Sequence, residues 1–455
     1  MGLMKISSYH KKLGDSVRFV KGINKNLECE YWDRIYVSTL FTYNWKTTID
    51  AIKYYKALVH GDSSRIIVGG IMSSLMPNEV WKETGVVPIQ GVLSSPYMLD
   101  SDNPLIVEDM IPDYDLFDES FPDYTLIKDS YFGYVTRGCL NKCKFCGVPI
   151  LEPEFIDYKN NTLRNYIERI KDTYGEKQHL VFFDNNILGS KKFEQIIHDI
   201  IDLGFYKGAK RNNKMRHVDF NQGTDARLMK EKHIDLISQI AIYPLRIAFD
   251  YIELKDIYCE KIRLAAKYNI KNISNYVLYN YKDTPKDLWD RLKINIELND
   301  ELNLRIYSFP MKYIPINNKD RRYVAEPEWN WYFLRNTQRI LNVLKGSVMT
   351  NEDFFNRAFG SNYEEFLTIL HMPENILMYR GREAKSQEIE WKNKFKALTP
   401  HEKKEMLNIL NNNTSRRLLK KAVAQIKNQK LYQILEYYLP DKPIDDNLEL
   451  FDNSH

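Results

Sequence analysis

The sequence predicts an α/β protein with parallel sheets in its first two thirds and a helical region at its end. Short β-branched or aromatic runs alternate with amphipathic helical patterns over residues 1–96, and again over residues 131–320. After residue 321 the patterns are helical. Strands that alternate with helices in this way are typical of parallel sheets, because a parallel connection must cross back over a face of the sheet.

Residues 1–96 have the pattern of a small, doubly wound parallel sheet. Apolar residues at helical spacing before Gly14 predict a first helix, and a second is expected over residues 46–58. The pair Gly69-Gly70 follows a strand pattern, where it could let a phosphate approach the backbone or simply form a tight turn. Strands are expected at four runs: 16–20, 34–41, 64–68 and 86–93.

Residues 97–130 form the predicted connection to the next part, and they are acidic. Ten Asp or Glu side chains stand here against one Lys, together with three prolines. Like charges that repel one another and prolines that interrupt helices predict an extended, solvated linker.

Residues 131–320 hold six strand patterns in succession, with a helical pattern after each of the first five. The strands are expected at 131–136, 179–183, 217–220, 245–249, 272–279 and 305–309. The carboxyl ends of such strands meet at one edge of a parallel sheet, which is where barrel-like folds place their active sites. Polar clusters follow the strands at that same end: three cysteines, Asp184-Asn185-Asn186, the stretch 221–227, Asp250 and Asp283-Thr284-Pro285.

The loop after the first of these strands carries Cys139, Cys143 and Cys146, with the spacing C-x3-C-x2-C, and Phe145 precedes the last cysteine. Three thiolates on one short loop can hold three irons of a cubane cluster, because soft sulfur suits iron. The fourth iron would then be open to a small molecule. A structural zinc site is an alternative, although closed zinc sites take four ligands and no fourth cysteine or nearby histidine accompanies the three. A buried trio of inert thiols is another.

This motif and the polar strand ends resemble the radical S-adenosylmethionine (SAM) superfamily, of the branch with an N-terminal cobalamin-binding-like, Rossmann-type domain. The resemblance covers nearly all of residues 131–315 and implies that residues 131–320 form a partial (β/α)6 TIM-like barrel. It implies a [4Fe–4S] cluster on the three cysteines, with SAM chelated by the open iron. It further implies reductive cleavage of SAM to a 5′-deoxyadenosyl radical, and an electron donor of the flavodoxin or ferredoxin type.

The resemblance also implies contacts to SAM at the strand ends. Asp184-Asn185-Asn186 stands in place of the family's Gly-Gly-Glu, so the contact to the SAM amino group would come from Asp184 or an Asn carbonyl. Asp250 ends the fourth strand, where ribose contacts are common, and Thr284 lies in a loop where the family often has Gly-x-Pro-Gly-Glu-Thr. A solvated or helix-capping role suits these two equally well. An Arg can hold a carboxylate with two parallel hydrogen bonds. The other positions implied to contact SAM are Phe145, Asn221, Gln222, Asp225 and Arg227.

The sequence does not match the Asp-x-His-x-x-Gly loop that many cobalamin proteins of other families carry. His10 lies inside the first predicted helix, and His60 precedes Gly61-Asp62. Some superfamily members bind cobalamin without that histidine. Cobalamin is therefore possible but unsupported, and a cobalamin-dependent radical SAM methyltransferase is the alternative enzyme. The sequence identifies no catalytic acid or base and no substrate.

Residues 321–455 carry helical patterns and a basic stretch. Between residues 391 and 430 there are eleven Lys or Arg against two Glu, so the local net charge is +9. Such a face could bind the phosphates of nucleic acid, or it could be a solvated helix surface. A different class of function thus stays open, a non-catalytic iron–sulfur or zinc protein that binds nucleic acid.

The composition is that of an ordinary globular protein. Of the 455 residues, 44% are hydrophobic and 28% are charged, and the net charge is +4. No run approaches the ~18 apolar residues of a membrane span, and the first residues lack the apolar core of a signal peptide. Five cysteines, three of them in one loop, do not make a disulfide framework. We therefore expect a cytoplasmic protein without membrane partners.

Overall fold

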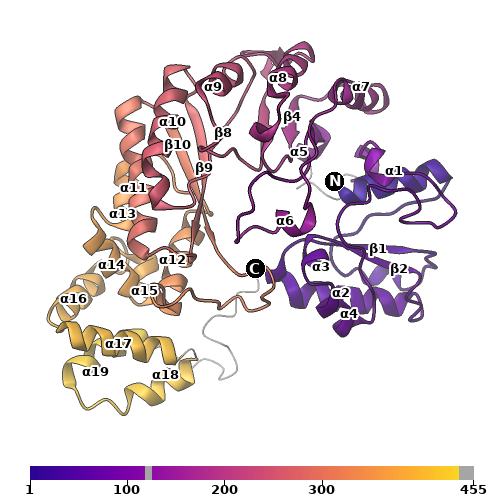
Figure 1. Cartoon of the computed structure of the whole chain (residues 1–455). Coiled ribbons are helices and arrows are strands. Elements are labelled where there is room, and N and C mark those ends of the chain that lie inside the picture. Colours follow the sequence, from indigo (N-terminus) through magenta and orange to yellow (C-terminus); the bar gives the residue numbers. More distant parts are fainter. Residues whose placement is uncertain (118–124, 414, 440–455) are drawn as a thin grey trace. The chain divides into compact units, whose positions relative to one another are not determined.

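A computed structural model describes residues 1–117, 125–413 and 415–439 (Figure 1). The chain divides into two compact units. Unit 1 contains Met1–Ala248, Asp256–Asn275 and Ile314–Arg321, and unit 2 contains Phe249–Lys255, Tyr276–Tyr313 and the chain from Arg322 on. Parts of the predicted linker (118–124) and of the predicted C-terminal region (414 and 440–455) lie outside the described residues.

The N-terminal part of unit 1 contains a two-stranded parallel sheet. β1 (Ile35–Thr39) pairs with β2 (Ile66–Gly70), and α2 (Trp45–Leu58) connects them. The first helix, α1 (Gly2–Leu13), ends as predicted at Gly14, whose φ of 90° suits glycine. The helices after β2 are α3 (Ile71–Leu75) and α4 (Pro77–Thr84).

The strands predicted at residues 16–20 and 86–93 are wrong, because both segments are irregular. A backbone hydrogen bond of 2.8 Å from the Ile89 N–H to the Val68 carbonyl joins the second segment to β2. Pro88 beside it has no N–H for a strand ladder. The doubly wound sheet predicted here is therefore a two-stranded sheet among the described residues.

The glycine pair at the end of β2 serves the packing of the two strands. Gly70 has a φ of +101°, and a Cβ atom there would lie 2.3 Å from the carbonyl oxygen of Thr39. The Thr39 hydroxyl donates a 2.9 Å hydrogen bond to the Gly69 carbonyl. Only glycine allows the backbones to approach this closely in this conformation.

The middle of unit 1 contains a three-stranded parallel sheet in the order β3-β4-β7. Isolated parallel bridges from Val218 to Ile242 and from Thr224 to Ile247 continue it toward the next strand. That strand, β8 (Leu245–Arg246), pairs in parallel with the start of β9 (Asn272–Tyr279). The other strands and the connecting helices are β3 (Ser130–Gly133), α7 (Thr162–Tyr174), β4 (His179–Phe182), α8 (Phe193–Asp202), β7 (Val218–Phe220), α9 (Glu231–Ile237) and α10 (Lys255–Lys267).

β9 runs from unit 1 into unit 2, where α11 (Pro285–Leu302) and β10 (Arg305–Lys312) follow it. All six predicted strands of residues 131–320 are therefore present, and the described strands form open sheets without a closed barrel. The sequence did not predict the short α5 (Thr125–Lys128), α6 (Val148–Leu151) or the hairpin β5–β6 (Lys210–Arg211 and Lys214–Met215).

The described part of the predicted acidic linker is packed against α1, which corrects the expectation of an extended, solvated segment. Asp113 is fully buried, accepts a 2.6 Å hydrogen bond from the Ser7 hydroxyl and pairs with Lys11 at 2.8 Å. Asp100 accepts a 2.6 Å hydrogen bond from the Tyr9 hydroxyl. Groups on α1 neutralise or satisfy these carboxylates, so the charges do not drive the segment into solvent.

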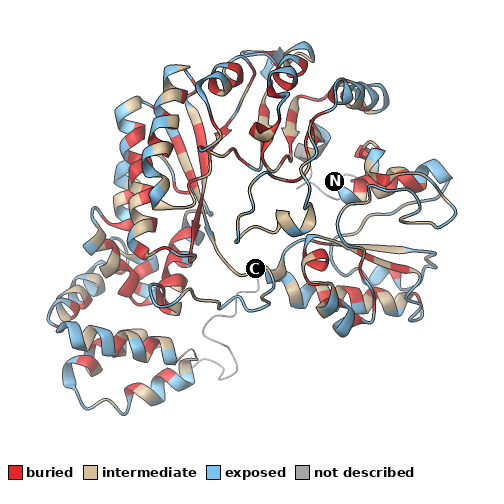
Figure 2. Ribbon diagram, in the orientation of Figure 1, coloured by how far each residue is buried: buried red, intermediate tan, exposed pale blue. Residues whose placement is uncertain are grey.

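Unit 2 contains the end of β9, β10 and helices. Buried residues (red in Figure 2) run along β9, and two of the eight residues of β10 are buried. Trp329 and Trp391 are among the largest buried side chains of unit 2. No helix of the described ranges is long and apolar enough to cross a membrane. The region after residue 321 is helical as predicted, although no pattern predicted α15 or α17. Its helices are α12 (Trp331–Val343), α13 (Glu352–Phe359), α14 (Tyr363–His371), α15 (Glu374–Tyr379), α16 (Lys385–Lys396), α17 (Pro400–Asn412), α18 (Arg416–Val423) and α19 (Gln429–Leu435).

His371 makes the stability of unit 2 depend on pH. The ring contacts Phe333 and Phe395, its Nδ1 lies 2.7 Å from the Leu367 carbonyl, and burial lowers its pKa to about 4. The unfolded chain binds a proton at His371 below about pH 6.5 and the folded chain does not, so stability falls as the pH drops from 6.5 to 4. We expect the contribution of His371 to the free energy of unfolding to fall by about 2 kcal/mol between pH 7 and pH 5, measured by urea unfolding against a variant that lacks the imidazole.

The His371→Gln variant is the control, because glutamine is uncharged over this range and all other titrating groups are retained. Its stability should change by about 2 kcal/mol less between the two pH values than that of the wild type. Equal changes in the two proteins would show that His371 titrates normally.

Candidate functional site

The three predicted cysteines lie on the cysteine loop, residues 134–147, which follows β3. Each is partly exposed, and no disulfide joins any of the chain's five cysteines, all of which are in the described ranges. The Asn141 N–H lies 3.4 Å from the sulfur of Cys139, and the Val148 N–H lies 3.5 Å from that of Cys146. The Cys146 N–H donates to the Cys143 carbonyl at 3.1 Å, which forms a turn between them.

The chemistry of this donor set fits an iron–sulfur cluster. Within the described ranges, no three His, Cys, Asp or Glu side chains converge closely enough to hold a metal ion, so the thiols share the loop without converging. Three solvent-accessible sulfur atoms on one short loop are nevertheless soft donors that suit iron. Backbone N–H groups directed at the sulfurs are among the means by which proteins tune such clusters.

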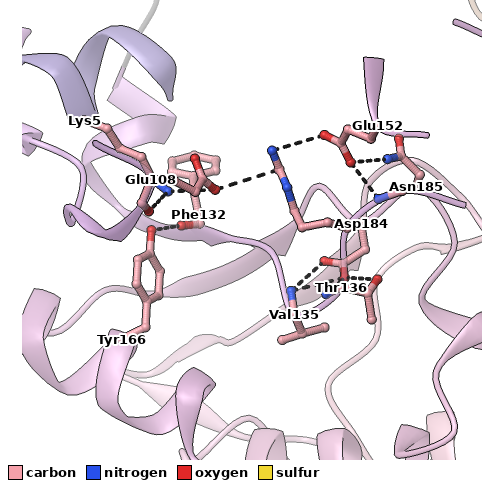
Figure 3. Close-up of polar contacts among 11 residues, drawn as sticks. Lys5, Glu108, Phe132, Val135, Thr136, Glu152, Tyr166, Asp184 and Asn185 are labelled. Atoms are coloured by element: carbon pink, nitrogen blue, oxygen red, sulfur yellow. Dashed lines mark hydrogen bonds and ion pairs between the residues drawn. The ribbon is translucent and has the colours of Figure 1, made fainter. Parts of the chain in front are cut away.

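Asp184 fastens the start of the cysteine loop to the end of β4. Its two carboxylate oxygens each accept from the Val135 N–H at 3.1 Å, and Oδ1 also accepts from the Thr136 N–H and hydroxyl at 2.5 and 2.6 Å (Figure 3). The side chain is buried, and burial raises the pKa of the carboxyl to about 6. Because the loop backbone occupies this carboxylate, an Asn carbonyl is the better candidate for the predicted contact to an amino group.

Asn186 supplies such a carbonyl. The residue is buried, and its Oδ1 atom has no hydrogen-bond partner in the described part of the chain. A buried acceptor left without a donor costs about 1–3 kcal/mol, so a ligand that brings an N–H group would relieve that cost. Its neighbour Asn185 is engaged differently, because its side-chain amide donates to Glu152 at 3.2 Å.

A line of alternating charges runs from α1 to the cysteine loop. The Lys5 ammonium pairs with Glu108 at 3.1 Å, and the Arg137 guanidinium lies 3.9 Å from Glu108 and 3.1 Å from Glu152. Figure 3 shows Lys5 beside Glu108, and Glu152 beside Asn185. Two carboxylates, Glu108 and Glu152, therefore hold the Arg137 guanidinium, and Lys5 holds Glu108.

Glu152 also holds the residue that precedes the first cysteine. Its Oε2 atom accepts a 2.7 Å hydrogen bond from the Gly138 N–H. Gly138 has a φ of +70°, and a Cβ atom there would lie 2.1 Å from the Glu154 carbonyl oxygen. The glycine in the motif is therefore required by this close approach of two backbone segments.

Asp225 and Arg227, which follow β7, hold the middle of the loop. The Arg227 Nε and Nη2 atoms donate to Asp225 at 2.9 and 2.6 Å, and the Asn141 amide donates to Asp225 at 2.6 Å. Asp225, and to a smaller extent Cys143, raise the pKa of Arg227. Arg227 thus binds Asp225 and Cys143 in this structure, whereas the sequence predicted a contact to the SAM carboxylate.

The remaining predicted residues divide between the two units. Asn221 and Gln222 lie together at the end of β7, with 3.3 Å between their side-chain amides, and Phe145 is half-buried in the cysteine loop. Asp250 and Thr284 are in unit 2. The Thr284 hydroxyl accepts from the Asp287 N–H at 3.1 Å and caps α11, which is the capping role weighed from the sequence.

Sequence reasoning missed Glu108, Arg137, Gly138, Asn141 and Glu152. The local signal for Gly138 is its place between an arginine and the first cysteine. The charged residues gave no signal of their own, because Lys5 and Glu108 are 103 positions apart in the chain. Asn141 and Asp225 are separated by 84 positions.

No known family model matches the chain, and no curated protein sequence does. Similar solved structures include the radical S-adenosylmethionine methyltransferase TsrM from Kitasatospora setae, which holds cobalamin and a [4Fe–4S] cluster. It is 11% identical, with a TM-score of 0.44, over 64% of this chain and 67% of that one.

Two further solved structures are similar. The cobalamin-dependent S-adenosylmethionine radical enzyme OxsB is 15% identical, with a TM-score of 0.40, over 90% of this chain and 67% of that one. SuiB of Streptococcus suis, bound to the precursor peptide SuiA, is 11% identical, with a TM-score of 0.34. That match covers 56% of this chain and 55% of SuiB.

Proposed function

We propose that the chain is a radical SAM enzyme, with a [4Fe–4S] cluster held by Cys139, Cys143 and Cys146. The observation that carries this proposal is a C-x3-C-x2-C loop at the carboxyl end of β3, fastened by polar side chains that follow β4, α6 and β7. Side chains that bind a cofactor must be held in defined positions by supporting hydrogen bonds of this kind. Thiols held for a cluster meet that requirement, whereas an inert surface loop does not.

When bound, such a cluster would supply the electron that cleaves SAM reductively to a 5′-deoxyadenosyl radical. Among the chain's own residues, the unpartnered Oδ1 atom of Asn186 would accept a hydrogen bond from the SAM amino group. Asn221 and Gln222 would contact the ribose or carboxylate from the end of β7. Asp184, Asp225 and Arg227 would position the loop, because each is already bonded to it.

The same proposal implies a domain architecture, a cellular compartment and an electron donor. The strands β3, β4, β7, β8, β9 and β10 would form a partial (β/α)6 barrel within residues 131–320, flanked by a Rossmann-like domain (1–96), the segment 97–130 and the helical region from 321 on. Accessible cluster cysteines need reducing surroundings, which favours the cytoplasm. A small flavodoxin or ferredoxin would supply the electrons.

Anaerobic reconstitution tests this function. With dithionite and SAM, the wild-type chain should bind about four irons and release 5′-deoxyadenosine. The Cys143→Ala variant should lose this release, since only two ligands remain. Cys29→Ala, an exposed cysteine outside the loop, is the matched control and should retain it.

A stoichiometric zinc content without iron, or undiminished 5′-deoxyadenosine release by Cys143→Ala, would contradict the proposal. Absorption spectra of the purified chain also decide whether cobalamin, the cofactor of the alternative enzyme, is retained.

A further inference from the structure

The C-terminal helices of unit 2 carry a positively charged surface. Residues 406–435 contain six Lys or Arg and no Asp or Glu. Four of the six are on α18, a helix of eight residues. Three of these four are exposed and one is partly exposed; they are Arg416, Arg417, Lys420 and Lys421. We call these four cations the α18 surface.

The α18 surface differs from the basic helix α16. On α16, Lys392 pairs with Glu388 at 2.7 Å and Lys394 pairs with Glu390 at 2.8 Å, each one turn apart. On α18 the residues one turn apart are Arg416 with Lys420 and Arg417 with Lys421, so like charges face each other. Each such pair destabilises a helix by about 0.2–0.5 kcal/mol. No described carboxylate forms an ion pair with any of the four cations.

The inner face of α18 is already occupied, which decides between two kinds of anionic partner. Leu419 and Val423 are buried in the helical core of unit 2, whereas Leu418 is an isolated exposed apolar residue. A basic helix that binds a bilayer must insert its apolar face, and this helix has that face buried in protein. A protein partner would need an apolar or aromatic centre to its interface, and one leucine does not supply it.

We propose that the α18 surface binds the phosphate backbone of a nucleic acid. Closely spaced cations that have no carboxylate partners match a chain of regularly spaced phosphates, and binding would release the counterions condensed on the nucleic acid. The phosphates would also relieve the repulsion between the like charges on the helix. This inference is independent of SAM cleavage, and it adds a partner class to the function proposed above.

Fluorescence anisotropy with a labelled single-stranded RNA of twenty nucleotides tests the inference on the full chain. The wild type should bind with an affinity that falls steeply between 50 and 300 mM salt. Replacing all four cations of the α18 surface by glutamine should lower the log–log salt slope by about three, at roughly 0.7 per lost phosphate contact. Binding at 100 mM salt should weaken at least tenfold.

A second quadruple variant is the matched control, because it removes the same number of charges from lysines that are paired within the protein. It combines Lys46→Gln, Lys286→Gln, Lys392→Gln and Lys394→Gln. Its affinity for RNA should change less than twofold. Circular dichroism should show unchanged helix content in both variants, since glutamine is a good helix former.

Three outcomes would overturn the inference: no binding of RNA or duplex DNA at 50 mM salt, equal weakening in the two variants, or binding of anionic phosphatidylserine vesicles or polyglutamate as tight as that of RNA. Release of 5′-deoxyadenosine is measured on the same proteins. Loss of RNA binding without loss of that release in the α18 variant separates this inference from the proposed enzyme function.

Discussion

The Asp184→Ala variant is expected to free the cysteine loop and to lose the ability to retain iron. Removing the carboxylate leaves the Val135 N–H, the Thr136 N–H and the Thr136 hydroxyl without their acceptor in a buried place. Each buried donor left unsatisfied costs about 1–3 kcal/mol, so the fastened form of the loop should be destabilised by several kcal/mol. Hydrogen exchange over residues 134–147 should accelerate at least a hundredfold, and iron bound after reconstitution should fall to background.

Asp199→Ala is the matched control for this experiment. Asp199 is also a fully buried carboxylate in unit 1, and it accepts hydrogen bonds from Tyr158 and Arg164. Its removal should destabilise the protein but leave exchange over residues 134–147 and the iron content close to wild type. If both variants lose iron equally, the effect of Asp184 is general instability. If Asp184→Ala retains iron and slow exchange, the loop is fastened by other groups.

The Arg291→Met variant is expected to destabilise unit 2 by about 3–5 kcal/mol, the usual result of removing one partner from a buried ion pair. Arg291 is fully buried, and its Nη2 atom pairs with Asp283 at 2.6 Å. Its Nη1 atom donates to the carbonyls of Asp250 and Leu278, both at 2.7 Å. The substitution leaves the Asp283 Oδ2 atom and the two carbonyls without this donor, while Asp283 Oδ1 still accepts from the Tyr281 N–H and the Trp329 indole N–H. Urea unfolding followed by tryptophan fluorescence measures the loss.

The sign of the pH dependence gives this prediction a second test. Burial already raises the pKa of Asp283 to about 6, although Arg291 opposes the rise. Without Arg291 the folded state should bind its proton still more tightly than the unfolded state, whose carboxyl titrates near 4. The destabilisation should therefore be larger at pH 8 than at pH 5.5.

Lys286→Met on the same helix is the control, since Lys286 forms an exposed pair with Asp290. Exposed pairs one turn apart contribute about 0.3–0.5 kcal/mol, so its effect should be small. The double variant Arg291→Met/Asp283→Asn should recover part of the loss, because the unpaired charge is gone. A loss below about 1 kcal/mol for Arg291→Met alone, or a double variant no more stable than the single one, would contradict this account of the ion pair.

Hydrophobic periodicity correctly predicted the strands that pair with another strand in the structure. The strand at residues 272–279 was predicted with the bounds of β9, because an apolar run beside helical patterns is unambiguous. The runs 16–20 and 86–93 also contain β-branched residues, but neither forms a ladder with a neighbouring strand, and Pro88 in the second run has no N–H for one. A strand exists only as part of a ladder, and a single sequence does not show whether the ladder is completed.

The residues of the candidate site were also predictable only in part. Spacing along the chain identified the three cysteines, and the register of the strands drew attention to Asp184, Asn186 and Asp225. Their partners were not predictable, because Asp184 meets Thr136 across 48 positions and Asn141 meets Asp225 across 84. The acidic segment was misjudged for the same reason, since Asp113 accepts a hydrogen bond from Ser7 and is neutralised by Lys11, both on α1.

The distances along the chain between these partners set an order of events during synthesis. The cysteine loop leaves the ribosome before Asp184, Asp225 and Arg227, so none of the groups that fasten it from β4 and β7 exists when the motif first appears. Translation adds about 5–20 residues per second, so the more than eighty residues between Asn141 and Asp225 take roughly 4–17 seconds. During that interval the three cysteines lie on a segment that has not yet formed these hydrogen bonds. We therefore expect the iron–sulfur cluster to be inserted only after unit 1 has folded.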